Sequence, residues 1–100
     1  MTLRVVVRPP ALEDIAESAT WYENQCPGLG LELTDEVINA IHRPRENPNL
    51  FRIIRSRDGI RRVLTERFPF RVFFSINRDV LYVHAVLHGA RSDRHWRGRP

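Results

Sequence analysis

Lysine is missing from this sequence, cysteine occurs once and no apolar run is long, and the last two shortages each exclude a class of protein. Because Cys26 stands alone, it can form neither an internal disulfide nor a paired-cysteine zinc site, which favours the reducing cytosol. The longest apolar stretches, such as 72–76 and 81–86, are far shorter than the roughly 20 residues of a membrane helix. The first residues also lack the apolar region of a secretory signal peptide. We therefore expect a cytoplasmic protein without a membrane partner.

The common catalytic motifs are missing as well. The sequence has no glycine-rich phosphate loop, no nucleophile elbow and no helical histidine pair beside a glutamate. It therefore predicts neither a metal nor a cofactor. A length of 100 residues with 42% hydrophobic composition predicts one domain over 1–100, with a two-layer core too small to enclose a large pocket. A surface partner is therefore a better expectation than a small substrate.

Charge is abundant but unevenly divided between the two halves of the chain. Residues 1–50 carry eight acids against four arginines and residues 51–100 carry four acids against twelve, so −4 is followed by +8. All 16 cations are arginine, whose planar guanidinium can hold a phosphate through two hydrogen bonds and stack on bases. The basic half therefore indicates a polyanionic partner, either a nucleic acid or an acidic protein.

The apolar pattern of the first half predicts a strand followed by two helices. A β-branched run at 3–7 is expected to form a strand that stops before Pro9 and Pro10. Helical spacing then predicts a first helix with an apolar side formed by Leu12, Ile15, Ala19 and Tyr22. After the break at 26–28, a second helix has an apolar side formed by Leu33, Val37, Ile38 and Ile41. The second helix should end near Pro44, and the short link predicts an antiparallel helical hairpin.

The second half changes to the alternating pattern of strands, which we expect at 60–66, 69–77 and 80–87. A two-residue loop at 78–79 would place Phe73 opposite His84 and Arg71 opposite Val86. The apolar face of these two strands would consist of Phe70, Val72, Phe74, Ile76, Leu81, Val83, Ala85 and Leu87. The sequence thus predicts an α+β fold of order β-α-α-β-β-β, in which the helical hairpin covers one face of a small antiparallel sheet.

The opposite, open face of the predicted sheet combines arginine, imidazole and aromatic groups. Its residues are Arg62, Arg71, Phe73, Tyr82, His84 and His88, with Arg91 nearby. Such a face can hold a phosphodiester and stack a base, and histidine can transfer the protons that RNA cleavage requires. In this register Arg71 and His88 lie within about one side-chain length, which makes His88, Arg71 and Arg91 the candidate catalytic residues. An ordinary solvated surface explains any one of them equally well, and packing against Phe73 explains His84.

Several short motifs in this chain form a recognisable series. They are Ala11-Leu12-Glu13-Asp14-Ile15, Trp21-Tyr22-Glu23, Pro27-Gly28-Leu29-Gly30, Asn47-Pro48 with Phe51, Ile60-Arg61-Arg62, Phe68-Pro69-Phe70-Arg71-Val72, and 83–88 with Arg91 and Trp96. Together they span nearly the whole chain and resemble the RelE/ParE superfamily of bacterial toxins from type II toxin-antitoxin pairs. The resemblance implies the same α+β fold that the apolar pattern of the sequence predicts. It also implies one of two activities, poisoning of DNA gyrase or ribosome-dependent cleavage of mRNA.

The resemblance assigns roles to particular residues. In the RelE-like endoribonucleases the working groups lie on the second strand, at the start of the third and after the fourth, where this chain has Arg62, Arg71, His88, Arg91 and Trp96. Trp96 replaces the usual tyrosine and Leu64 takes the place of a basic group, while the motifs at 21–23 and 27–30 are commoner in ParE-like members. The target-binding residues are therefore expected to be Arg62, Arg71, Arg91, Arg94, Trp96 and Arg97. Trp96 would either stack a base or pin the C-terminal segment to the sheet.

The resulting expectation is a ParE-like toxin of a plasmid-stabilisation module, which poisons DNA gyrase and is held in a hetero-oligomer by a cognate antitoxin. The alternative is a RelE-like ribosome-dependent mRNA endoribonuclease. A third possibility is a small nucleic-acid-binding module whose arginines provide affinity alone.

Overall fold

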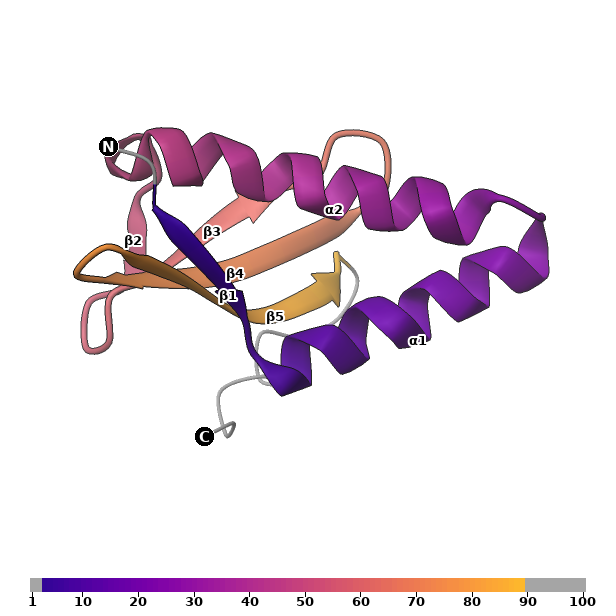
Figure 1. Cartoon of the computed structure of the whole chain (residues 1–100), viewed down its shortest axis with the longest axis horizontal. Helices are drawn as coiled ribbons and strands as arrows, with labels where there is room; N and C mark the ends of the chain where they lie inside the picture. Colours follow the sequence, from indigo (N-terminus) through magenta and orange to yellow (C-terminus); the bar gives the residue numbers. More distant parts are fainter. Residues whose placement is uncertain (1–2, 90–100) are drawn as a thin grey trace.

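A computed structural model describes residues 3–89 and contains a helical hairpin packed on a five-stranded sheet (Figure 1). The elements are β1 (Arg4–Val7), α1 (Pro9–Gln25), α2 (Leu29–Glu46), a short 3-10 helix η1 (Pro48–Leu50), β2 (Ile53–Arg55), β3 (Ile60–Leu64), β4 (Phe70–Asn77) and β5 (Val80–His88). The strand order is β1-β5-β4-β3-β2. The predicted α+β fold, with its hairpin on one face of the sheet, is confirmed.

Both edges of the sheet differ from the expectation. β1 pairs in parallel with the first half of β5, with Arg4 opposite Val80 and Val7 opposite Val83, so the sheet is mixed rather than purely antiparallel. At the other edge, β2 pairs antiparallel with β3 and adds a strand that the sequence did not predict. Its three residues are too few for an alternating pattern to be visible.

Prolines lie at the start of α1 and near the end of α2. Two prolines occupy the first turn of α1, where a backbone N–H has no helical partner to lose. α2 runs past the buried Pro44 to Glu46, two residues beyond the predicted end, and Arg45 Nε donates a 2.6 Å hydrogen bond to the carbonyl of Leu3. In the described part of the chain, neither helix combines the length and hydrophobicity that crossing a membrane requires.

The link between the helices is closed by one carboxylate and a close backbone approach. Glu23 accepts hydrogen bonds from the backbone N–H groups of Gly28 and Gly30 at 3.0–3.1 Å. Gly28 has a φ of +94°, which favours glycine. At Gly30 an added Cβ would lie only 2.7 Å from the Ala19 carbonyl oxygen. The motif at 27–30 therefore sets the distance between α1 and α2.

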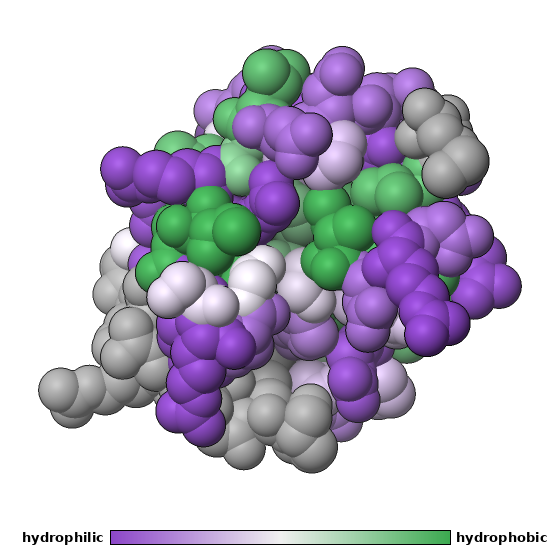
Figure 2. Space-filling view, turned by 90° about the vertical axis from the view of Figure 1, so that its left-hand side faces the viewer, coloured by the Kyte–Doolittle hydropathy of each residue, from purple (hydrophilic) through white to green (hydrophobic). Residues whose placement is uncertain are grey.

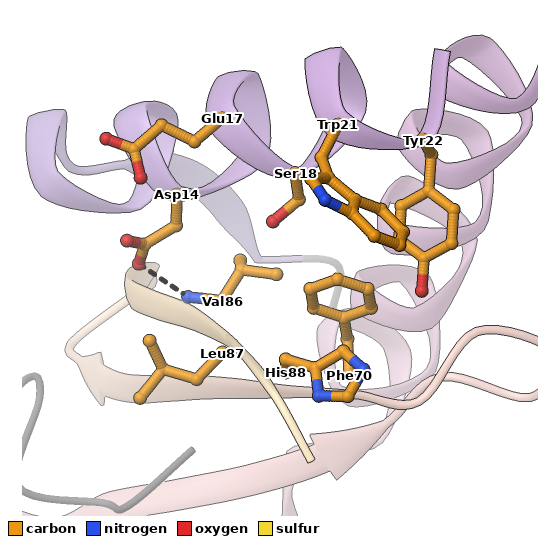
Figure 3. A pocket seen from close by; sticks show the side chains of 9 residues that line it. All are labelled: Asp14, Glu17, Ser18, Trp21, Tyr22, Phe70, Val86, Leu87 and His88. Atoms are coloured by element: carbon orange, nitrogen blue, oxygen red, sulfur yellow. Dashed lines mark hydrogen bonds between the residues drawn. The ribbon is translucent and has the colours of Figure 1, made fainter. Parts of the chain in front are cut away.

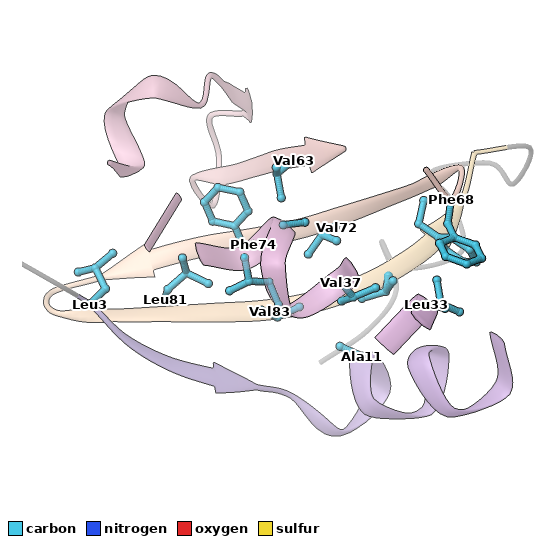
Figure 4. Packing of buried hydrophobic residues seen from close by; sticks show 14 residues of the cluster. Leu3, Ala11, Leu33, Val37, Val63, Phe68, Val72, Phe74, Leu81 and Val83 are labelled. Atoms are coloured by element: carbon cyan, nitrogen blue, oxygen red, sulfur yellow. The ribbon is translucent and has the colours of Figure 1, made fainter. Parts of the chain in front are cut away.

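The main core lies between the helices and the sheet (Figure 4). It contains Leu3, Ala11, Leu33, Val37, Ala40, Ile41, Val63, Phe68, Phe70, Val72, Phe74, Leu81, Val83 and Val86. Two predicted core residues, Leu12 and Ile38, are instead 54% and 50% exposed. Their neighbours Ala11 and Val37 are 0% and 1% exposed, so each helix turns the side that carries Ala11 or Val37 towards the core.

A β-bulge in β5 changes the predicted register. Next to the turn, Asn77 pairs with Val80 and Ser75 with Tyr82, as expected. The register then shifts, because Phe74 pairs with Val83 but Phe73 pairs with Ala85, which leaves His84 as an additional residue in β5. Side chains of β5 beyond this point therefore change face relative to the prediction.

The bulge overturns the predicted pairs at the far end of the hairpin. Phe73 does not pair with His84, and Arg71 pairs with Leu87 rather than Val86. Val86 joins the main core on the helix side. Ala85 and Leu87, which we had expected there, instead form a second apolar cluster, the open-face cluster, which consists of Ile60, Phe73, Ala85 and Leu87. This cluster lies on the open face, the side of the sheet away from the helices.

Candidate functional site

The two described arginines of the predicted site lie on the open face. Arg62 pairs with Phe73 across β3 and β4, and Arg71 lies two residues before Phe73 on β4. The side chains of both arginines therefore share one side of the sheet with Phe73. The Arg71 guanidinium carbon lies 5.6 Å from the centroid of the Phe73 ring. Both arginines are half-buried. The open face therefore has an apolar centre with guanidinium groups beside it.

His84 also lies on the open face, but its partner differs from the predicted one. As the additional residue of the bulge it reaches Ser75, and its Nε2 lies 2.6 Å from Ser75 Oγ. Burial lowers the pKa of His84, and the positive charge of Arg8 lowers it further. A lowered pKa favours the neutral imidazole, which suits His84 to its hydrogen bond with Ser75.

His88 lies on the other side of the sheet. It pairs with Phe70, and the two rings meet edge to face with centroids 5.5 Å apart. The expectation that Arg71 and His88 share a site is therefore wrong, because the His84 bulge places them on opposite faces. The remaining predicted site residues lie outside the described residues, and these are Arg91, Arg94, Trp96 and Arg97.

His88 is part of a groove between α1 and the end of β5 (Figure 3). The groove has a volume of about 560 Å³ and is lined by Asp14, Glu17, Ser18, Trp21, Tyr22, Phe70, Val86, Leu87 and His88. Figure 3 shows the two carboxylates at one end and the aromatic rings with His88 at the other. The groove thus offers separate acidic and aromatic ends to a partner.

Asp14 completes the edge of β5 where β1 ends. β1 pairs with β5 only as far as Val83, and Asp14 Oδ2 accepts a 3.0 Å hydrogen bond from the backbone N–H of Val86. The sequence analysis did not predict this contact of Asp14. A signal was present, since Asp14 and Ser18 stand three and seven residues after the buried Ala11, which puts them on the same side of the helix.

Apolar side chains are also exposed away from this groove. Seen from the end with η1, β2 and the β4–β5 turn, apolar surface forms patches bordered by hydrophilic side chains (Figure 2). Leu50 and Ile53 of this region are 78% and 46% exposed. Within residues 3–89, no three His, Cys, Asp or Glu side chains are placed to hold a metal ion.

The comparisons with known proteins agree with this architecture. A chain described as "Chromosomal ParDE TA system from P. aeruginosa" is similar in structure, with a TM-score of 0.75 and 15% identity, covering 87% of this chain and 96% of that chain. At this identity the likeness shows the fold alone. A search of curated proteins found no match. A family model described as "ParE toxin of type II toxin-antitoxin system, parDE" matches residues 5–93. Because this match spans most of the sequence, the chain belongs to the ParE family of toxins of type II toxin-antitoxin systems.

Proposed function

We propose that this protein is the toxin of a type II toxin-antitoxin module of the plasmid-stabilisation kind, that it arrests growth by poisoning DNA gyrase, and that a cognate antitoxin neutralises it. Membership of the ParE family over residues 5–93 supports the module. The observation that favours gyrase over mRNA is the separation of Arg71 from His88 by the bulge at His84.

RNA cleavage by internal attack needs a proton-transferring group beside the group that holds the phosphate. On the open face, Arg62 and Arg71 are suited to the phosphate, but His88 lies on the helix side of the sheet. The histidine that does share their face, His84, is hydrogen-bonded to Ser75 and has a lowered pKa. Within the described residues, this arrangement supports binding to a target more than acid–base catalysis by the predicted pair.

An antitoxin partner is supported by the charge of the chain and by its surface. Residues 51–100 carry a net charge of +8, which an acidic, flexible segment would neutralise. The groove between α1 and β5 and the exposed Leu50 and Ile53 provide apolar contact area. We propose that the antitoxin uses both features and forms a hetero-oligomer with the toxin.

Induction of the protein without antitoxin tests the proposal. We expect filamentation and double-strand DNA breaks in cells, and inhibition of purified gyrase. Arg62→Ala with Arg71→Ala should weaken both effects. The matched control is the double variant Arg52→Ala with Arg57→Ala, which removes the same charge from exposed arginines. Full supercoiling activity at toxin excess, together with mRNAs cut within codons on ribosomes, would instead establish the endoribonuclease.

A further inference from the structure

Ser75 and His84 form a hydrogen-bonded pair on the open face that the proposed binding of a target does not require. Ser75 Oγ lies 2.6 Å from His84 Nε2, and both residues are half-buried. A serine hydroxyl is a weak nucleophile by itself, but a neighbouring imidazole that accepts its proton activates it. The pair therefore contains the two groups that a reactive serine needs.

The β-bulge brings these two side chains together. Ser75 pairs with Tyr82, and in a regular strand the next residue of β5 on the same face, His84, would stand opposite Phe73. Because the register shifts here, Phe73 pairs with Ala85 instead and His84 is left as the additional residue of β5. Bulges often re-aim a side chain beside an active site, and in this sheet the imidazole is directed to the Ser75 hydroxyl.

The surroundings of His84 favour the form of the imidazole that can accept a proton. Burial is the largest cause of its lowered pKa, and the positive charges of Arg8 and Arg55 lower the pKa further, whereas Asp58 acts in the opposite direction. Asp58 is itself hydrogen-bonded to Arg55. A neutral imidazole with its proton on Nδ1 presents a lone pair on Nε2, to which the Ser75 hydroxyl donates its hydrogen bond.

We propose that Ser75 is a nucleophile with His84 as its general base, and that the pair makes Ser75 a site of covalent modification by activated phosphoryl compounds. Ser75 Oγ forms a bond to phosphorus, and the hydroxyl proton passes to His84 Nε2. The bond between phosphorus and the leaving group breaks, and the leaving group departs with the electron pair of that bond. His84 then releases the proton to water or to the leaving group.

The charges around the pair favour a phosphoryl group as the electrophile. Arg8 and Arg55 are near enough to His84 to lower its pKa. Guanidinium groups bind the oxygens of phosphate and stabilise the negative charge that develops on them during the transfer. The five described strands contain neither aspartate nor glutamate, so an anionic compound meets no carboxylate on the strands themselves.

Modification of Ser75 would change the charge of the open face. Arg62 and Arg71, to which we assign target binding, share this face with Ser75. A phosphate on Ser75 would carry a charge of about −1.5 to −2 near pH 7 and would offset the positive charge of these arginines. This consequence rests on the proposed function, whereas the reactivity of Ser75 does not. The measurements below report covalent chemistry alone.

Labelling with diisopropyl fluorophosphate tests the nucleophile. The reagent transfers its phosphoryl group to an activated serine and releases fluoride, and peptide mass spectrometry locates the label. In the full wild-type chain, we expect Ser75 to be labelled at least about tenfold faster than the half-buried Ser18 and the exposed Ser56, which serve as internal controls. Labelling of Ser75 no faster than that of these controls would overturn the proposal.

The pH dependence of labelling tests His84 as the base. Because the neutral imidazole accepts the proton, the labelling rate of Ser75 in the wild type should rise as pH rises through the pKa of His84, below 6.5, and then level off. A flat profile would overturn the role of His84 without the need for a variant. His84→Gln, checked for folding by circular dichroism, retains a hydrogen-bonding side chain but cannot titrate here. Its labelling should be at least about tenfold slower and without this step, and an unchanged rate or step would contradict the proposal.

Discussion

Replacing Gly30 by alanine should destabilise the protein, because the α1–α2 hairpin closes around the missing side chain. A Cβ at this position would lie 2.7 Å from the Ala19 carbonyl oxygen and 3.1 Å from Glu23 Oε1. Carbon–oxygen contacts are usually about 3.3–3.6 Å long. The Glu23 side chain can rotate away, but the Ala19 carbonyl belongs to the backbone of α1. The two helices must therefore separate locally by about 0.6 Å or more.

The expected cost follows from two opposing effects. Overpacking of this kind costs about 1–3 kcal/mol, and the better helix propensity of alanine returns up to about 1 kcal/mol. Displacement of Glu23 also weakens its hydrogen bonds to Gly28 and Gly30. We expect a net loss of about 1–2 kcal/mol in the free energy of unfolding, or about 4–15 °C in Tm for a protein of this size.

Urea unfolding followed by circular dichroism measures this loss. Asn39→Ala, at an exposed position of the same helix, is the control and should change stability by less than about 0.5 kcal/mol. If Gly30→Ala is as stable as the wild type, the close approach of the helices does not limit packing and the reasoning is refuted.

Three further predictions concern the loops, the bulge and the partner. Glu36→Ala should lower the free energy of unfolding by about 1–3 kcal/mol, because Glu36 accepts hydrogen bonds from the backbone N–H groups of Arg67 and Phe68. The control Glu32→Ala removes a surface ion pair with Arg67 and should lower it by less than about 1 kcal/mol. An equal loss in both variants would contradict this account. Because the pKa of His84 is lowered in the folded state, its contribution to stability should be fully present above pH 6.5 and be lost as pH falls through the folded pKa. In His84→Gln, Tm should therefore fall less steeply below pH 6.5 than in the wild type. An unchanged slope would show that His84 does not make this contribution. Association with the antitoxin should slow as salt rises, and stopped-flow rates independent of ionic strength would remove electrostatic attraction from the proposal.

Local patterns were sufficient to predict the order of the elements apart from η1 and β2. The helical stripe through Ile15 and Tyr22, the break at 26–28 and the turn at 78–79 each depend on a few neighbouring residues. The parallel pairing of β1 with β5 joins segments that are far apart in the sequence, and no local signal specifies it. The family resemblance, rather than alternation, carried the prediction of the toxin class.

The bulge at His84 could not be predicted from the sequence, because the residues that follow it are all apolar. Beyond His84 the sequence continues with Ala85, Val86 and Leu87, which are all apolar. Either register therefore buries an acceptable residue on the helix side, and alternation cannot distinguish between them. The candidate site inherited this ambiguity, so Arg62 and Arg71 were placed on the correct face while His88 was not.

The strand order has a consequence for the time at which the protein becomes folded. β5 is the last strand of the described chain, yet it lies between β1 and β4 and also packs against α1. During synthesis, β1 therefore cannot pair in the sheet, and the apolar side of α1 cannot pack on β5, until residues 80–88 have been made. A nascent chain that lacks β5 has neither the complete core nor the open face with its arginines. The open face, to which we assign target binding, can therefore form only after residue 88 has been synthesised. Until then, a toxin with this strand order lacks its proposed binding surface.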